Sequence, residues 1–174
     1  MSLAFCLLFD AVDPGRNETM TTGVRIERAL AADLGVVLAL LAQCDLPLDG
    51  LSDHLATMVV ARHDGRVVGS AALELYADGA LLRSVAVAPA LRGQGIGRSL
   101  TERAIALGES LNARAIYLLT TTADAYFPRL GFERIDRDGV SDGVRTSIEF
   151  ASACPSTATV MRRDLRLLHG RAIE

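Results

Sequence analysis

The residues LLRSVAVAPALRGQGIGRSL, at positions 81–100, carry the strongest structural signal in this chain. They begin as an apolar run typical of a buried strand, turn at Pro89, and continue through a glycine-rich loop into a helix. Because Gly93, Gly95 and Gly97 lack a Cβ, the backbone there can approach a ligand closely. The first N–H groups of the following helix and the positive end of its dipole form an anion site, which suits a pyrophosphate.

Two arginines flank this loop, and Arg92 and Arg98 can add countercharge from either side. The alternative is a tight turn before a helix with no ligand. A dinucleotide-binding GxGxxG loop is excluded because Leu100 stands at the third glycine position, and no parallel βαβ unit precedes it. A GK[ST] phosphate loop is excluded as well, because Arg98-Ser99 stands where the lysine pair belongs.

The segments before this stretch predict three consecutive antiparallel strands. Thr57–Arg62 and Arg66–Tyr76 read as a hairpin, since His63-Asp64-Gly65 contains the Asp-Gly pair that favours a tight turn. Asp78-Gly79 then turns the chain into a third strand, Ala80–Ala88.

The rest of the chain alternates between helical and strand patterns. The helix near residue 34 has Asp33 in its first turn, where a negative charge suits the dipole. A second helix follows the glycines. The other expected elements are strands at Val24–Ala29, Ala115–Thr120, Phe132–Arg137 and Thr157–Arg162, and helices at Ala123–Leu130 and Ser141–Ala151.

Length and composition predict one globular domain, at residues 20–174, after an extension of residues 1–19 that we expect to be disordered. The net charge of −3 gives no basic footprint for nucleic acid. The apolar run Leu3–Phe9 has no basic residue before it, so it reads poorly as a signal peptide, and no run is long enough to span a membrane.

Cysteine and histidine usage predicts neither a disulfide framework nor a metal site. Cys6, Cys44 and Cys154 are odd in number and form no CxxC pair, which fits reduced thiols in a cytoplasm. The three histidines share no metal-ligand spacing. The tail from Leu165 mixes leucines with arginines, and both a homodimer contact and a frayed helix stay open for it.

The motif from Arg92 to Gly97 resembles the acetyl-CoA loop of the GNAT superfamily of N-acetyltransferases, and Val85–Pro89 resembles that family's fourth strand. The resemblance covers about residues 24–165. It implies an α+β fold with a mixed, mostly antiparallel central sheet of six to seven strands. The sheet is expected to splay between its fourth and fifth strands, with a bulge in the fourth and helices on both faces.

The resemblance also implies a ligand and the residues that hold it. Acetyl-CoA is the expected co-substrate, with no metal. Backbone N–H groups near Val87 are expected to receive the thioester carbonyl. The residues implied in acetyl-CoA binding are Val85, Ala86, Val87, Arg92, Gly93, Gln94, Gly95, Ile96, Gly97, Arg98 and Ser99.

Three segments, at 69–87, 118–132 and 145–161, resemble the arsenic-resistance N-acetyltransferases, and the first two are also similar to amino-acid N-acetyltransferases. The implied acceptor is the primary amine of a small molecule, either an amino acid or an arsenical amino-acid analogue. Two other functions stay open: acetylation of a protein or peptide, and acyl-CoA binding by a regulatory module without catalysis.

Alternation along residues 66–76 sets Glu74 opposite an apolar face, so we interpret it as the general base that deprotonates the amine. A solvated strand glutamate is the alternative. Arg83 is a charge in a strand that should be central, on the face of Leu81 and Val85 by strict alternation. It is expected either to clasp a substrate carboxylate or to pair with Glu74. The apolar face comprises Val67, Gly69, Ala71, Leu73 and Leu75.

The acid that protonates the leaving thiolate is less well marked. Many GNAT enzymes place a tyrosine three residues before Leu-Gly-Phe, where this chain has Phe127. Tyr126 is one residue away and is interpreted as core, although it could serve as the acid in a different register. Water or the threonines at 120–122 are the other candidates for the thiolate. Further along, Arg145 and Glu149 are four apart and suggest a surface helical pair. Cys154 is a candidate contact for an arsenical or a small buried hydrophobe.

Overall fold

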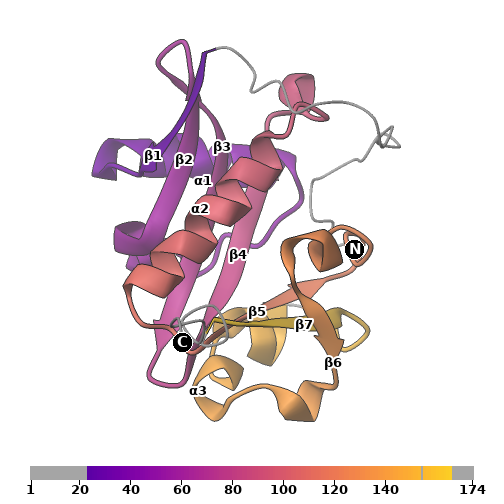
Figure 1. Ribbon diagram of the computed structural model, residues 1–174. Coiled ribbons are helices and arrows are strands. Elements are labelled where there is room, and N and C mark those ends of the chain that lie inside the picture. Colours follow the sequence, from indigo (N-terminus) through magenta and orange to yellow (C-terminus); the bar gives the residue numbers. More distant parts are fainter. Residues whose placement is uncertain (1–22, 154, 166–174) are drawn as a thin grey trace, which may run out of the picture.

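The computed structural model describes residues 23–153 and 155–165, which form a seven-stranded sheet in the order β1-β2-β3-β4-β5-β7-β6 (Figure 1). Neighbouring strands pair antiparallel except β4 and β5, which are parallel. The mixed, mostly antiparallel sheet expected from the sequence is therefore confirmed. The strands are β1 (Val24–Arg28), β2 (Met58–His63), β3 (Arg66–Tyr76), β4 (Gly79–Val87), β5 (Ala115–Thr120), β6 (Glu133–Ile135) and β7 (Thr159–Asp164).

Helices cover both faces of this sheet, as expected. Leu100 of α2 packs in one hydrophobic cluster with Leu73, whereas Val37 of α1 packs in another with Ala72. Because neighbouring residues of β3 point to opposite faces, the two helices lie on opposite sides. The helical elements are η1 (Ala31–Asp33), α1 (Leu34–Gln43), η2 (Leu51–Thr57), η3 (Pro89–Leu91), α2 (Ile96–Ser110), η4 (Phe127–Leu130), η5 (Arg137–Gly139), α3 (Asp142–Arg145) and the π-helical turn η6 (Glu149–Ala153).

The β2–β3 hairpin turns where the sequence predicts it. Asp64 has φ 49° and Gly65 has φ 76°, so both central residues of the turn are left-handed. That conformation matches the twist of the flanking strands and favours Asp-Gly.

β4 contains the irregularity that positions the functional site. Its pairing with β3 passes from Ser70 opposite Ala86 to Ala72 opposite Arg83, which leaves one extra residue in β4, and Ser84 has φ 55°. This is the expected bulge. Beyond it β4 also leaves β5, because these strands pair only at Ala80 and Leu81 within the described residues. The splay expected between the fourth and fifth strands is therefore present.

The bulge corrects the strict alternation assumed for β4. Leu81 packs in the cluster that contains Val144 of α3, whereas Val85 packs in the cluster of α2. Arg83 thus does not share a face with Val85. In β3, likewise, Val67 packs with the α1 cluster rather than beside Ala71.

Two predicted helices are shorter than expected, for local reasons. At Ala123–Leu130 only η4 forms, because the Thr120 hydroxyl accepts the Ala123 N–H at 2.9 Å and Pro128 has no N–H to continue a helix. At Ser141–Ala151 the helix is split into α3 and η6, where the Ser147 hydroxyl accepts the Phe150 N–H at 3.0 Å.

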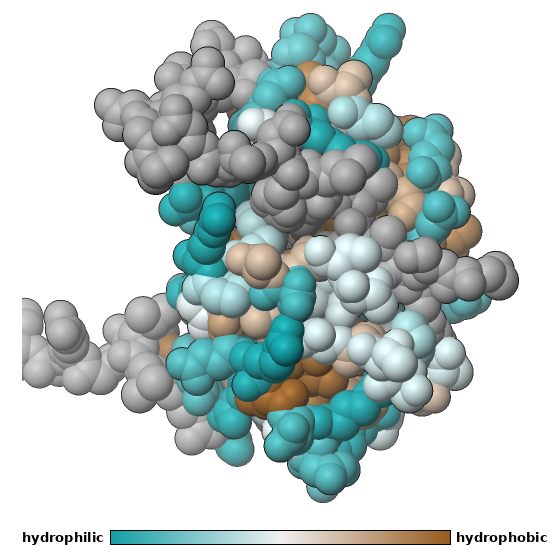
Figure 2. All heavy atoms as spheres, turned by 90° about the vertical axis from the view of Figure 1, so that its right-hand side faces the viewer, coloured by the Kyte–Doolittle hydropathy of each residue, from teal (hydrophilic) through white to brown (hydrophobic). Residues whose placement is uncertain are grey.

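The surface on the side that carries β6 is largely hydrophilic, with hydrophobic residues in separate small patches (Figure 2). The predicted extension at residues 1–19 lies outside the described residues, as do Cys154 and the chain from residue 166. The predictions of disorder, of an arsenical contact and of a dimer contact in the tail therefore stay predictions.

Candidate active site

The first part of the site is the glycine loop, residues 93–97, which leads into α2. Gly93 has φ 75° and Gly95, the N-cap of α2, has φ 77°. A Cβ on Gly95 would meet nothing within 4 Å, so this glycine is required by backbone conformation and not by space. The loop is exposed at Gly93, Gln94 and Gly95, while Ile96 and Gly97 are buried. The first turn of α2 therefore presents its N–H groups at an exposed bend.

The two flanking arginines are placed differently. Arg92 donates from Nε to the Val87 carbonyl at 3.1 Å and from Nη2 to the Cys44 thiol at 3.5 Å, which ties the loop to the end of β4. Arg98 extends along α2 and bonds Glu102 at 2.9 Å. Ser99 continues the helix, since its N–H donates to the Gly95 carbonyl at 3.0 Å.

The edge of β4 that leaves β5 forms the second part. The side chains of Val85, Ala86 and Val87 are buried. The Ala88 N–H donates to the Val68 carbonyl at 2.7 Å, toward β3. Successive strand residues direct their amide groups to opposite edges, so the Val87 N–H points to the splayed edge. An extended ligand can pair with this edge as an added strand would.

The third part is a charge cluster, which we define as Glu74 of β3, Arg83 of β4 and Glu149 of η6. The Arg83 guanidinium is fully buried and forms ion pairs with Glu74 at Nη1 and with Glu149 at Nε, the latter at 3.0 Å. Its Nη2 donates to the Asp49 carbonyl at 2.9 Å, and Nε lies 3.3 Å from the Ser84 hydroxyl. The cluster therefore joins four segments of the chain beside the bulge.

Glu74 has two further neighbours in this cluster. The Tyr76 hydroxyl donates to its Oε2 at 2.6 Å, and His54 Nε2 lies 3.5 Å from its Oε1. Burial and the hydrogen bond to Glu74 raise the pKa of Tyr76, so its phenol stays protonated. Of the two interpretations of Arg83, the pairing with Glu74 is present here. The buried position of Glu74 differs from a solvated strand glutamate.

Glu149 was missed by reasoning from the sequence. Burial raises the pKa of Glu149 to about 7. The positive charge of Arg83 lowers this pKa in part, and the negative charge of Glu74 raises it. The surface pair with Arg145 is wrong, because Arg145 bonds the Asp138 carbonyl while Glu149 turns inward to Arg83. The π-helical turn changes the side-chain directions that an α-helical spacing of four assumes, and no local signal marks this.

Tyr126 and Phe127 both lie in the core beside α2. Their rings meet edge to face with centroids 5.1 Å apart, and Phe127 contacts Phe132 similarly. Burial raises the pKa of Tyr126 to about 12, so its phenol remains protonated at neutral pH. Thr120 has a capping role, since its hydroxyl accepts the Ala123 N–H.

The two halves of the site lie on opposite faces of the sheet. Arg83 is opposite Ala72, which packs with α1, whereas Leu100 and Ile96 of α2 pack on the other face. Beyond Leu81, β4 no longer pairs with β5 within the described residues, and the bulged part of β4 lies between the two halves. An anion held at α2 and a polar group held at the charge cluster can thus approach each other along the bulged part of β4.

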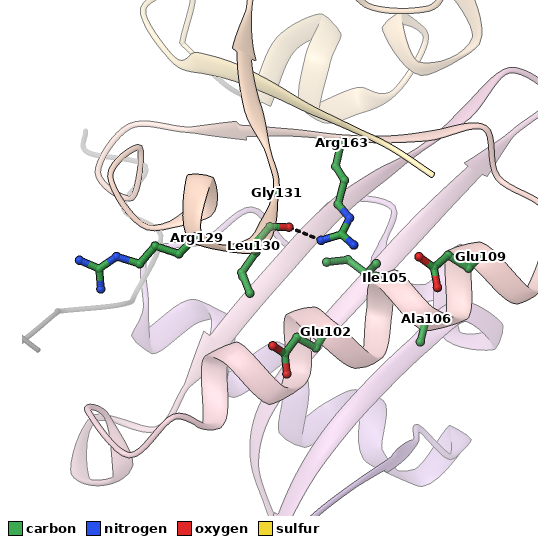
Figure 3. A pocket seen from close by; sticks show the side chains of 8 residues that line it. All are labelled: Glu102, Ile105, Ala106, Glu109, Arg129, Leu130, Gly131 and Arg163. Atoms are coloured by element: carbon green, nitrogen blue, oxygen red, sulfur yellow. Dashed lines mark hydrogen bonds between the residues drawn. The ribbon is translucent and has the colours of Figure 1, made fainter. Parts of the chain in front are cut away.

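A separate hollow of about 450 Å³ lies between α2, η4 and β7 (Figure 3). Glu102 and Glu109 line it from α2, and Arg163 reaches across to the Leu130 carbonyl. None of the predicted site residues lines it. Its mixed charges and open shape assign it no ligand.

Residues 54–134 match the family described as acetyltransferase (GNAT) domain. This part of the chain is similar to GNAT acetyltransferase domains. An uncharacterized N-acetyltransferase of Chlorobaculum tepidum is 30% identical over 92 residues, which is 52% of this chain and 59% of the relative. An amino-acid acetyltransferase of Mycobacterium tuberculosis is 37% identical over 81 residues, 44% of this chain and 46% of the relative.

Solved structures share the fold of this chain. N-acetylglutamate synthase from Neisseria gonorrhoeae, complexed with coenzyme A and N-acetyl-glutamate, has a TM-score of 0.72 at 22% identity over 82% of this chain and 35% of that one. A Mycobacterium tuberculosis protein in complex with CoA has a TM-score of 0.70 at 25% identity, over 81% of this chain and 99% of that one. The chain spans about half the length of the two curated relatives it matches.

Within the described residues, no helix has the length and apolar character needed to cross a membrane. The same part of the chain holds no group of three His, Cys, Asp or Glu side chains arranged for a metal ion.

Proposed function

We propose that this protein transfers the acetyl group of acetyl-CoA to the primary amine of a small molecule, by direct attack in a ternary complex. The observation that carries the proposal is the opening of β4 from β5 beside the glycine turn that begins α2. A pyrophosphate site and a strand edge that does not pair with β5 then lie one after the other. A ligand with a diphosphate and a long pantetheine arm requires this arrangement. The GNAT match over residues 54–134 supports the same activity.

Acetyl-CoA fits the residues that are present. The pyrophosphate would meet the N–H groups at the start of α2, where Gly95 leaves open space, with Arg92 and Arg98 as countercharge. The pantetheine arm would follow the edge from Val85 to Val87. The Val87 N–H would receive the carbonyl oxygen of the thioester as its negative charge develops.

The acceptor amine must lose a proton before it attacks, because an alkylammonium has a pKa of about 10.4. We assign this step to Glu74, whose carboxylate lies in the charge cluster beside the bulge. Attack of the neutral amine on the carbonyl carbon gives a tetrahedral intermediate. Its nitrogen loses its extra proton to solvent as the intermediate collapses and releases CoA as the thiolate. Water or the Tyr126 phenol would then supply the proton to sulfur.

For the acceptor we propose an amino acid or an arsenical amino-acid analogue. The similarity to an amino-acid acetyltransferase over 81 residues supports the amino acid. Resemblance of the segments at 69–87, 118–132 and 145–161 to arsenic-resistance enzymes supports the arsenical. Arg83 is the residue we assign to the carboxylate of either one. The reaction would take place in the cytoplasm.

A thiol-release assay tests the activity against amino acids, arsenical analogues and peptides in parallel. Release that depends on an amino acid or its arsenical analogue supports the proposal, and release with peptides alone would favour a protein acetyltransferase. Calorimetry with CoA runs beside it. CoA binding without thiol release for any amine would instead identify a regulatory module.

A further inference from the structure

Each nitrogen of the Arg83 guanidinium contacts a group of the protein itself. Nε bonds Glu149, Nη1 bonds Glu74, and Nη2 donates to the Asp49 carbonyl. The side chain is also inaccessible to solvent. A substrate carboxylate can therefore reach Arg83 only when part of the protein around it moves.

The partners of Arg83 are held with different strength. Glu74 lies within the sheet on β3 and also contacts the Tyr76 hydroxyl and His54. Glu149 lies on the irregular turn η6, outside the sheet, and Arg83 is the partner of its carboxylate among the described residues. Glu149 is thus the carboxylate that can leave at the lower cost.

Only a thin cover separates Arg83 from the surface at this point. A Cβ on Gly50 would lie 3.3 Å from Ile148 Cδ1 and 3.9 Å from Arg83 Nη1, so the two loops that carry Gly50 and Ile148 meet over the guanidinium. Ile148 is 47% exposed although it is apolar. Displacement of the Ile148 side chain would admit a ligand from this side, and rotation of the Glu149 side chain within the cluster would then free Arg83 Nε.

We propose that Glu149 occupies the carboxylate site of Arg83 while no acceptor is bound, and that the carboxylate of the acceptor displaces it. This inference rests on the proposed function and names the acceptor class: an amine that carries a carboxylate or a similarly shaped oxyanion. An acceptor without that group leaves Glu149 on Arg83, so Glu149 acts as a specificity-determining residue.

The exchange changes the number of protons bound to the protein. A Glu149 carboxylate that rotates off Arg83 and stays enclosed would lose its cation and remain near Glu74, with the neutral Tyr76 phenol and His54 on the other side of Glu74. With Arg83 beside it the pKa of Glu149 is already raised to about 7, so the loss of Arg83 raises that pKa further. The incoming carboxylate takes the cation and Glu149 takes a proton from the buffer, which leaves the charge of the cluster unchanged.

The test is calorimetry at pH 8 on CoA-saturated protein, titrated with amino acids and, separately, with their carboxamides, in buffers of different ionisation heat. For wild-type protein we expect the uptake of about one proton for each amino acid bound. For Glu149→Gln we expect no uptake and about tenfold tighter binding of the amino acid, with binding of the carboxamide unchanged.

Glu27→Gln is the matched control, because Arg62 likewise lies between two carboxylates, those of Glu27 and Asp33, away from the site. It should behave as wild type. Equal proton uptake in wild type and Glu149→Gln, equal affinities for the amino acid, or no amino-acid binding by either protein overturns the exchange. Thiol release with another amine would in each case leave acetyl transfer standing, so the two proposals fail separately.

Discussion

The glycine loop and the charge cluster are assembled in opposite ways. The loop is contiguous, and its geometry comes from Gly93 and Gly95 at positive φ followed directly by α2. The cluster draws on residues 49, 74, 83 and 149, which the sheet and two loops bring together. A site built from neighbouring residues depends on backbone conformation, whereas a site built from residues far apart in the sequence depends on the balance of buried charge. Substitutions should therefore affect the two regions through different quantities.

The largest effect is expected at Arg83. Replacing it by methionine leaves Glu74 and Glu149 buried without their cation. We expect Arg83→Met to lower the free energy of unfolding by about 3–5 kcal/mol at pH 8, measured by urea titration. The control Arg98→Met removes a half-exposed pair with Glu102 and should change stability little. Similar losses for both would show that the cluster contributes no special stability.

Glu74→Gln tests the assignment of the base. The variant keeps the shape of the side chain, and Glu149 still neutralises Arg83, so the protein should fold. We expect kcat to fall about 100-fold with CoA affinity unchanged, since general bases typically contribute that much. Glu133→Gln, at an exposed position of β6, should retain wild-type kcat. Full kcat in Glu74→Gln at every pH would remove Glu74 from the mechanism.

Glu149 gives the cluster a pH dependence that the loop lacks. The pKa of Glu149 is about 7 in the folded protein, against an ordinary value of 4.5. Between pH 4.5 and pH 7 the folded protein therefore keeps a proton on Glu149 that the unfolded chain has released. Stability from this group is therefore lost as pH rises from about 4.5 to 7. The stability difference between Glu149→Gln and wild type should move by about 2 kcal/mol in favour of the variant from pH 5 to pH 8.

That measurement uses urea unfolding at both pH values, with Glu27→Gln as the control. A difference between Glu149→Gln and wild type that does not change with pH would contradict a raised pKa for Glu149.

The smallest effect is expected in the loop. Gly95→Asp adds a carboxylate at the anion site, while Gly65→Asp makes the same change in a hairpin with nearly the same φ, 76° against 77°, and no close neighbour in either case. Backbone strain should thus be similar in both. Only Gly95→Asp should weaken CoA binding, by roughly tenfold in calorimetry, because of repulsion of the diphosphate. Equal affinities in the two variants would place the diphosphate elsewhere.

The structural features that the sequence predicted correctly depend on local chemistry. The Asp64-Gly65 turn, the strand lengths near the middle of the sheet and the start of α2 all depend on residues close in sequence. The splay and the bulge at Ser84 were expected from resemblance and not from alternation, which assigned Val85 to the wrong face. The helix expected at Ala123–Leu130 was too long because Pro128 and the Thr120 cap were not taken into account.

From the residues alone one obtains the phosphate-type loop at 93–97 and the three antiparallel strands before it, because turn conformations and periodicity act over a few residues. Tertiary structure alone decides that Glu149 turns inward, that His54 reaches Glu74, and that each nitrogen of Arg83 contacts a group of the protein. Those contacts join residues between 9 and 66 positions apart, and whether a buried charge finds a partner is settled by packing, which a local pattern does not contain.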